Sequence, residues 1–386
     1  MAVLGVASVT PAFPRITEAL DITPQSVGLL ISVFTVPGVV LTPALGILAD
    51  RIGRKAVLAP SLFVFALAGA ACGFARDFEL LMALRLLQGV GASALGALNV
   101  TIMGDLYGGT RRTTALGYNA SVLSVGTAVY PAVGGGLATL AWYAPFFLPV
   151  LAVPVGLVVL LVLQNPEPRF RRSLREYLTN AARIMGGREV LVMFCGSVVT
   201  FILIYGAFLS YLPFVLETSF GASPLWIGIA MSSTSVTTAV AAANLGRLAR
   251  AFGERRLIKV GFVLYVVSLA GIPFARSLWV LVALIMLFGV GNGINIPSIL
   301  AILTASAPAE YRAVFMSVNS TLFRLGQTLG PLVTGLAFTV MGLSGAFFVG
   351  AALGAAVLLV LVTALRGEPS ALSSQPSASA GRASSR

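Results

Sequence analysis

A short charged cluster and two isolated arginines are the residues of this sequence that could do chemistry. The cluster, residues 50–55, holds one acid and three bases, and its chemistry is ion pairing. Arg85 and Arg324 stand in long apolar stretches, where a charged side chain marks a functional site. The sequence holds no histidine, which excludes Ser-His-Asp and Cys-His catalysis and metal sites with histidine ligands. We therefore expect no enzyme, no cofactor and no metal.

Membrane-spanning helices must position these charges, because the chain is strongly apolar. Of 386 residues, 58% are hydrophobic and 10% are charged, against about 25% charged in soluble domains. A bilayer core needs about 20 apolar residues per helix. Eleven runs of this kind are present: 26–48, 56–75, 80–104, 114–140, 143–163, 190–213, 225–245, 257–275, 278–303, 317–341 and 342–365. The expected fold class is an all-α polytopic membrane protein.

An apolar piece, residues 1–14, precedes these runs and is too short to cross a bilayer alone. We expect it to belong to a first helix that lacks its cytoplasmic half, which makes twelve helices in total. The chain would then lie in the cell (inner) membrane with both termini in the cytoplasm.

The basic residues orient the spans. Twenty of the 25 Lys and Arg residues fall on one side of the membrane, and only Arg15, Arg76 and Arg276 fall on the other. A bias of this kind predicts that the basic side is cytoplasmic. Topology therefore explains the net charge of +12, and no nucleic acid is expected as a partner.

The two halves of the chain repeat at an ungapped shift of 200 residues. Gly46, Gly53, Arg76, Gly89 and Gly91 recur as Gly246, Gly253, Arg276, Gly289 and Gly291. Each half spans the membrane six times, so the repeats are parallel and related by an axis along the membrane normal. We expect four regions: a six-helix bundle at 1–163 with a partial first helix, a cytoplasmic linker with an amphipathic helix at 164–189, a second bundle at 190–365, and a disordered cytoplasmic tail at 366–386.

Three motifs carry a family resemblance. The loop block contains Gly46, Asp50, Arg51, Gly53, Arg54 and Lys55. The fourth-helix block contains Arg85, Gln88, Gly89 and Gly91. The fifth-helix block contains Gly117, Gly126, Pro131, Gly134 and Gly135, with Tyr130 where the pattern has glycine. In this order they resemble the motifs of the major facilitator superfamily, and the third is typical of its 12-helix drug:proton antiporter branch.

This resemblance implies alternating access between two bundles. It assigns the loop block to a cytoplasmic gate, where we expect Asp50, Arg54 and Asp105 to form an ion-pair cluster. A plain positive-inside loop would explain the three bases of the block but not Asp50. It also implies that Arg85 assists proton coupling or orients its helix; snorkelling to the outer interface is the alternative.

The expected substrate cavity is lined by neutral polar and aromatic side chains. The candidates are Asn119, Tyr205, Phe208, Tyr211, Asn292, Asn295, Asn319 and Arg324. Lipid-facing packing is an equal alternative for the aromatic residues. For Arg324, near the cytoplasmic end of its run, a gate contact and an anion contact are both open. No Asp or Glu lies inside a complete span, so a coupling acid either lies in sequence before Met1 or is not present.

The function that these features favour is secondary active export of small hydrophobic or amphipathic compounds, coupled to protons. A transporter of small organic anions is the first alternative, motivated by Arg85 and Arg324. A non-transporting receptor or scaffold with the same fold is the second. The expected partners are a small-molecule substrate, the proton and the lipid bilayer, and we expect a monomer.

Overall fold

The computed structural model describes residues 3–163, 185–308 and 312–364. The first half contains α1 (Leu4–Ala7), η1 (Thr10–Ala12), α2 (Phe13–Ala19), α3 (Pro24–Ile52), α4 (Arg54–Cys72), α5 (Phe78–Leu106), α6 (Gly109–Leu140), η2 (Ala144–Leu151) and α7 (Ala152–Val162). The second half contains α9 (Arg188–Ile202), η3 (Leu203–Tyr211), α10 (Leu212–Phe220), α11 (Pro224–Ala243), α12 (Leu245–Phe252), α13 (Glu254–Gly271), η4 (Ile272–Phe274), α14 (Leu278–Ser306) and α15 (Arg312–Ala364). The predicted linker helix and tail lie outside these described residues.

The helices of the described chain account for the predicted spans. Ten of them are long and apolar enough to cross a membrane. One of these, α15, is two helices joined at Gly342, whose φ of 67° and ψ of −163° break the helical path. The described residues thus contain eleven candidate spans, preceded by the short pieces α1, η1 and α2. The all-helical polytopic fold is confirmed, and the boundary between the last two spans lies where the sequence predicts it.

The repeat is visible in the element bounds. α5 and α14 begin at Phe78 and Leu278 and end at Leu106 and Ser306, which is the shift of 200 residues. The turn before α4 and the turn before α13 each depend on a glycine, Gly53 with φ 101° and Gly253 with φ 78°. Such positive φ values are easily adopted only without a Cβ atom. The end of the molecule that carries these two turns is called the basic end below.

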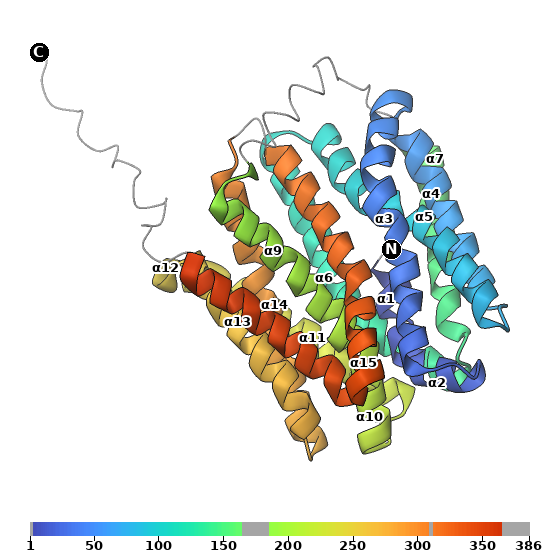
Figure 1. The fold of residues 1–386 in the computed structure, drawn as a ribbon. Helices are drawn as coiled ribbons and strands as arrows, with labels where there is room; N and C mark the ends of the chain where they lie inside the picture. Colours follow the sequence, from blue (N-terminus) through green and yellow to red (C-terminus); the bar gives the residue numbers. More distant parts are fainter. Residues whose placement is uncertain (1–2, 164–184, 309–311, 365–386) are drawn as a thin grey trace, which may run out of the picture.

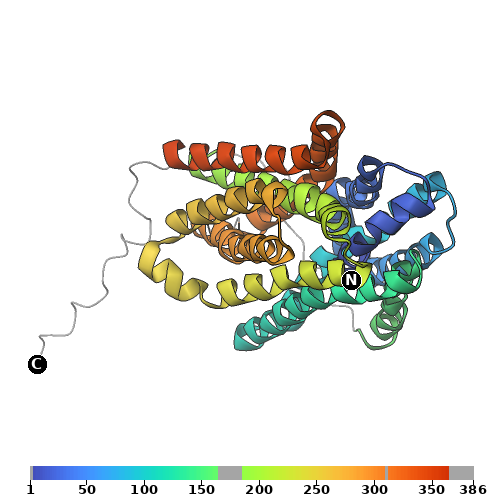
Figure 2. The ribbon, with the colours of Figure 1, turned by 90° about the horizontal axis from the view of Figure 1, so that it is seen from below.

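The two groups of helices meet mainly away from the basic end (Figure 1). Between α3 and α15, the Ser32 hydroxyl donates to the Thr328 carbonyl over 2.8 Å, and the hydroxyls of Thr35 and Thr328 are 2.9 Å apart. α6 and α11 run side by side (Figure 2) and are joined by a hydrogen bond from the Ser235 hydroxyl to the Thr127 carbonyl. These contacts close the half of the interface that is remote from the basic end.

Toward the basic end the interface is open. Residues 120–125 of α6 are exposed all around the helix, with Val122 at 70% and Val125 at 63%. Exposure on every face means that neither bundle covers this stretch. On α3, Val40 is also 70% exposed. The structure therefore shows two helical bundles whose interface is closed at one end and open at the basic end.

Candidate functional site

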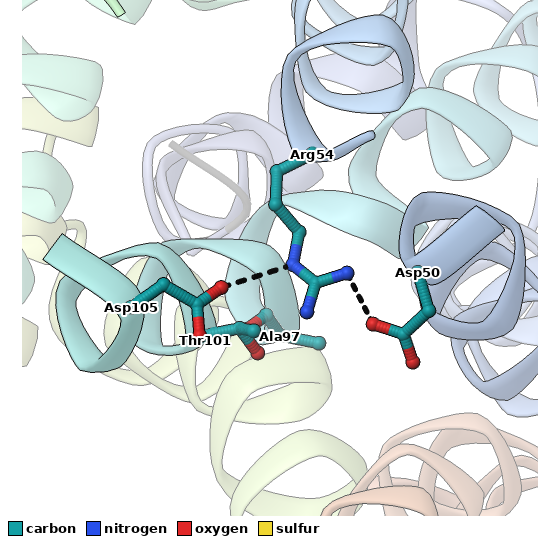
Figure 3. A network of polar contacts seen from close by, with 5 residues as sticks. All are labelled: Asp50, Arg54, Ala97, Thr101 and Asp105. Carbon is teal, nitrogen blue, oxygen red and sulfur yellow. Dashed lines mark hydrogen bonds and ion pairs between the residues drawn. The ribbon is translucent and has the colours of Figure 1, made fainter. Parts of the chain in front are cut away.

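The charged cluster predicted at the basic end is formed (Figure 3). Arg54, at the start of α4, forms an ion pair with Asp50 of α3 and donates from Nε to Asp105 Oδ2 of α5 over 3.2 Å. The Arg54 side chain is 12% exposed, while the two carboxylates are about one-third exposed. One guanidinium thus ties the ends of three helices of the first bundle together. Arg51 is exposed beside this cluster, and a Cβ atom built on Gly46 would meet no other part of the protein within 4 Å.

The second copy of this turn uses a different pair, which the sequence analysis missed. Arg250 replaces the acid and donates to the Gly246 carbonyl of its own helix. Arg255, at the start of α13, instead donates from Nε to Glu189 Oε1 of α9 over 2.8 Å. A signal was available, since Arg255 is the repeat equivalent of Lys55 and Glu189 is the acid directly before the apolar run 190–213.

Arg85 is completely buried inside the first bundle. Its guanidinium donates to the Gly5 carbonyl over 2.7 Å, to Gln88 Oε1 over 2.8 Å and to the Leu30 carbonyl over 3.3 Å. It also lies 4.7 Å from the ring centre of Phe34. This environment contradicts snorkelling to the interface, because the side chain points into the protein and joins α5 to α1 and α3.

The glycines of the three motifs differ in what they contact. A Cβ atom at Gly89 would overlap the backbone of Phe34, and one at Gly91 would overlap the backbone of α4. In the fifth-helix block, a Cβ at Gly134 would overlap the Ser8 backbone, whereas one at Gly117 would meet nothing within 4 Å and one at Gly126 would first meet the Tyr130 ring of its own helix. These glycines therefore serve close helix packing at some positions and not at others.

Gly135 belongs to a seam between the two bundles. A Cβ at Gly135 would overlap the Pro224 carbonyl of α11 and lie 3.2 Å from the Gly228 Cα atom. A Cβ at Gly228 would in turn overlap the Pro131 carbonyl of α6. Backbone thus touches backbone across the bundle interface at this point, which only small residues permit. Gly135, Pro131, Gly228 and Pro224 are called the glycine seam below.

The predicted amides mostly serve contacts within a bundle. In the second bundle, Asn295 donates to the Thr200 hydroxyl, Asn319 accepts from Ser197, and Asn292 accepts from the Tyr265 hydroxyl. All three asparagines are less than 10% exposed. In the open part of the first bundle, Asn119 accepts from the Asn99 amide over 2.6 Å. Of the four amides, the structure places only Asn119 next to exposed surface.

The predicted aromatic residues lie in η3, a π-helical stretch of the seventh span. Phe208 stacks on Phe288 with ring centres 4.5 Å apart, and Tyr211 stacks on Phe338 at 5.3 Å. Tyr205 stacks on Phe201 and is 8% exposed. All three rings pack inside the protein, so lipid-facing packing does not describe them.

Arg324 lies deeper than its apolar run suggests. The run begins near 317, but α15 begins at Arg312. Twelve helical residues separate Arg312 from Arg324, a rise of about 18 Å. The apolar residues 313–316 belong to this helix, so the predicted start of the run at 317 was several residues too late.

The sequence and the fold both resemble known transporters. The family model of the Major Facilitator Superfamily matches residues 1–223 and 193–385. The bacillibactin exporter of Bacillus subtilis (strain 168) is 26% identical over 86% of this chain and 85% of its own length. Multidrug resistance protein 1 of the same organism is 24% identical over 88% of this chain and 87% of its own.

Among solved structures, a bacterial homolog of the human lysosomal transporter Spinster, inward-facing and unoccupied, matches with a TM-score of 0.77. Its sequence is 18% identical, and the match covers 94% of this chain and 92% of that one.

Proposed function

The chain belongs to the Major Facilitator Superfamily and is a secondary transporter, and we propose that it exports small amphipathic compounds in exchange for protons. The observation that carries this proposal is the asymmetric interface between the bundles. It is closed at the glycine seam and open at the basic end, as one state of an alternating-access cycle requires.

Two findings support export rather than import. Pro131 and Gly135 of the glycine seam belong to the fifth-helix motif, which is typical of the antiporter branch. Two relatives that match over most of the chain are named as a bacillibactin exporter and a multidrug resistance protein. We assign the loop cluster of Asp50, Arg54 and Asp105 to the gate at the basic end, which we place in the cytoplasm.

Cysteine labelling tests the orientation. In a background without Cys72 and Cys195, Gly187→Cys before α9 is expected to react with a membrane-impermeant maleimide only from the cytoplasm. Ser219→Cys at the end of α10 is expected to react only from outside, because one span separates the two exposed positions. Labelling of both positions from the same side contradicts the proposed orientation.

Accumulation of a dye tests export. Cells that make the protein are expected to retain less of a lipophilic neutral or cationic dye than cells carrying the empty vector. Dissipating the proton gradient is expected to remove the difference, because the exchange loses its driving force. Equal accumulation of every compound in a broad panel, with the protein detected in the membrane, counts against export. A difference that survives dissipation of the gradient counts against proton exchange.

A further inference from the structure

Arg324 lies inside a span, and its positive charge has no ion-pair partner among the described residues. Arg85 donates to three oxygens, whereas Arg324 makes no hydrogen bond and no ion pair within the described part of the chain. A charge at this depth is costly and normally pairs with an opposite charge or lines a substrate path. A bound ligand is therefore a candidate for the partner of the Arg324 charge.

The guanidinium of Arg324 lies across the bundle interface in a space that two glycines leave free. A Cβ atom built on Gly38 of α3 would be 2.9 Å from Arg324 Cδ and 3.1 Å from Cζ. One built on Gly96 of α5 would be 3.7 Å from Nη2. The arginine of the second bundle thus rests on the backbone of the first, and no side chain from these two positions covers it.

Arg324 also stands where the closed half of the interface ends. Thr328 follows it by one helical turn and makes the contacts to Ser32 and Thr35. In the other direction along α3, Val40 is 70% exposed. Arg324 is itself partly exposed. A ligand that enters from the basic end therefore meets the guanidinium at the bottom of the opening.

An aromatic surface adjoins this cation. Phe323 and Phe201 lie with ring centres 4.2 Å apart, and Phe201 stacks on Tyr205 at 6.0 Å and 25°. A planar cation beside stacked rings suits a molecule with a carboxylate at one end and a flat apolar body.

We propose that Arg324 is a substrate-binding residue and that the compounds transported include amphipathic organic anions, held by a carboxylate at Arg324 and by an apolar body against Phe201 and Phe323. This assignment rests on the proposed export function and specifies its substrate class. The Gly38 backbone is part of the same site, because a side chain there would occupy the position of the guanidinium.

The test is equilibrium binding to the purified full-length protein in nanodiscs. The two probes are 2-naphthoate and the neutral 2-naphthylmethanol, which share one aromatic body. Arg324→Gln is expected to weaken naphthoate binding by about tenfold or more, since a charge-assisted bidentate contact is lost. Naphthylmethanol binding is expected to change less than about twofold. Gly38→Val, which keeps the charge but fills its space, is expected to weaken naphthoate selectively as well.

Arg276→Gln is the matched control, because it removes the same charge from an exposed position between η4 and α14. Unchanged naphthoate binding in Arg324→Gln overturns the proposal. An equal loss of both probes also overturns it, because that result indicates a structural or gating role.

Export from cells is measured separately. If naphthoate binding depends on Arg324 but no compound is exported, the export proposal fails and the binding site stands. If compounds are exported and naphthoate binding does not depend on Arg324, the binding site fails and export stands.

Discussion

Asp50→Asn is expected to remove most transport while leaving the amount of protein in the membrane unchanged. Asp50 pairs with Arg54 in the present state, which is open at the basic end. We expect the cluster to hold a helix terminus of the facing bundle when that end closes. Charge-assisted contacts are worth about 1.5–3 kcal/mol. Losing one shifts the population roughly 10- to 150-fold toward the state that is open at the basic end.

The readout is alkylation of a single cysteine in place of Ser317 on α15, which is exposed in this open state. Asp50→Asn is expected to raise its reactivity. Glu254→Gln is the control, since it removes a carboxylate from the equivalent turn of the second bundle, where the described residues give it no ion pair. Normal transport by Asp50→Asn, with no change at position 317, contradicts the gate assignment and leaves the cluster as a folding turn.

Gly135→Val is also expected to abolish transport. Unlike Asp50→Asn, it is expected to do so by disfavouring the state that is open at the basic end. Its side chain would separate α6 from the Pro224 carbonyl and prevent closure of the glycine seam. Overpacking of a tight contact costs about 1–3 kcal/mol. The state shown here would therefore lose population by roughly 5- to 150-fold. The reactivity of a cysteine at position 317 is expected to fall.

The neighbouring Gly136 supplies a matched control. A Cβ there would lie 3.7 Å from a Leu225 methyl group, which is an ordinary contact, so Gly136→Val is expected to retain transport. Asp50→Asn combined with Gly135→Val is expected to bring the reactivity at position 317 back toward the wild-type value. If the two changes do not offset each other, the cluster and the seam do not act on one equilibrium.

The sequence predicted where the helices begin and end better than it predicted which residues contact one another. Apolar length and the positive-φ glycines mark where helices begin and end, so the bounds of α5, α14 and the break at Gly342 lie close to the predicted ones. The first span was less predictable, because α1, η1 and α2 are short pieces interrupted at Pro11 and Pro14, where proline interferes with helical hydrogen bonding.

The partners of polar side chains could be predicted only where a motif implied them. The Arg54 cluster was of this kind. Asn292, Asn295 and Asn319 were expected at a cavity, but each amide is bonded to a neighbour within the second bundle. A span that is apolar on all sides does not show which face meets another helix, so its polar residues cannot be assigned to a cavity from spacing alone.

The hydrogen bond from Arg85 to the Gly5 carbonyl also has a consequence for biosynthesis. The two residues are 80 positions apart. At about 5–20 residues per second, a ribosome needs roughly 4–16 s to make that length of chain. During this time the segment α1 lacks the side chain that anchors it. Arg85, by contrast, enters the bilayer when its carbonyl acceptors already exist. The segment α1, although made earlier than α5, is therefore fixed by Arg85 only after α5 has been made.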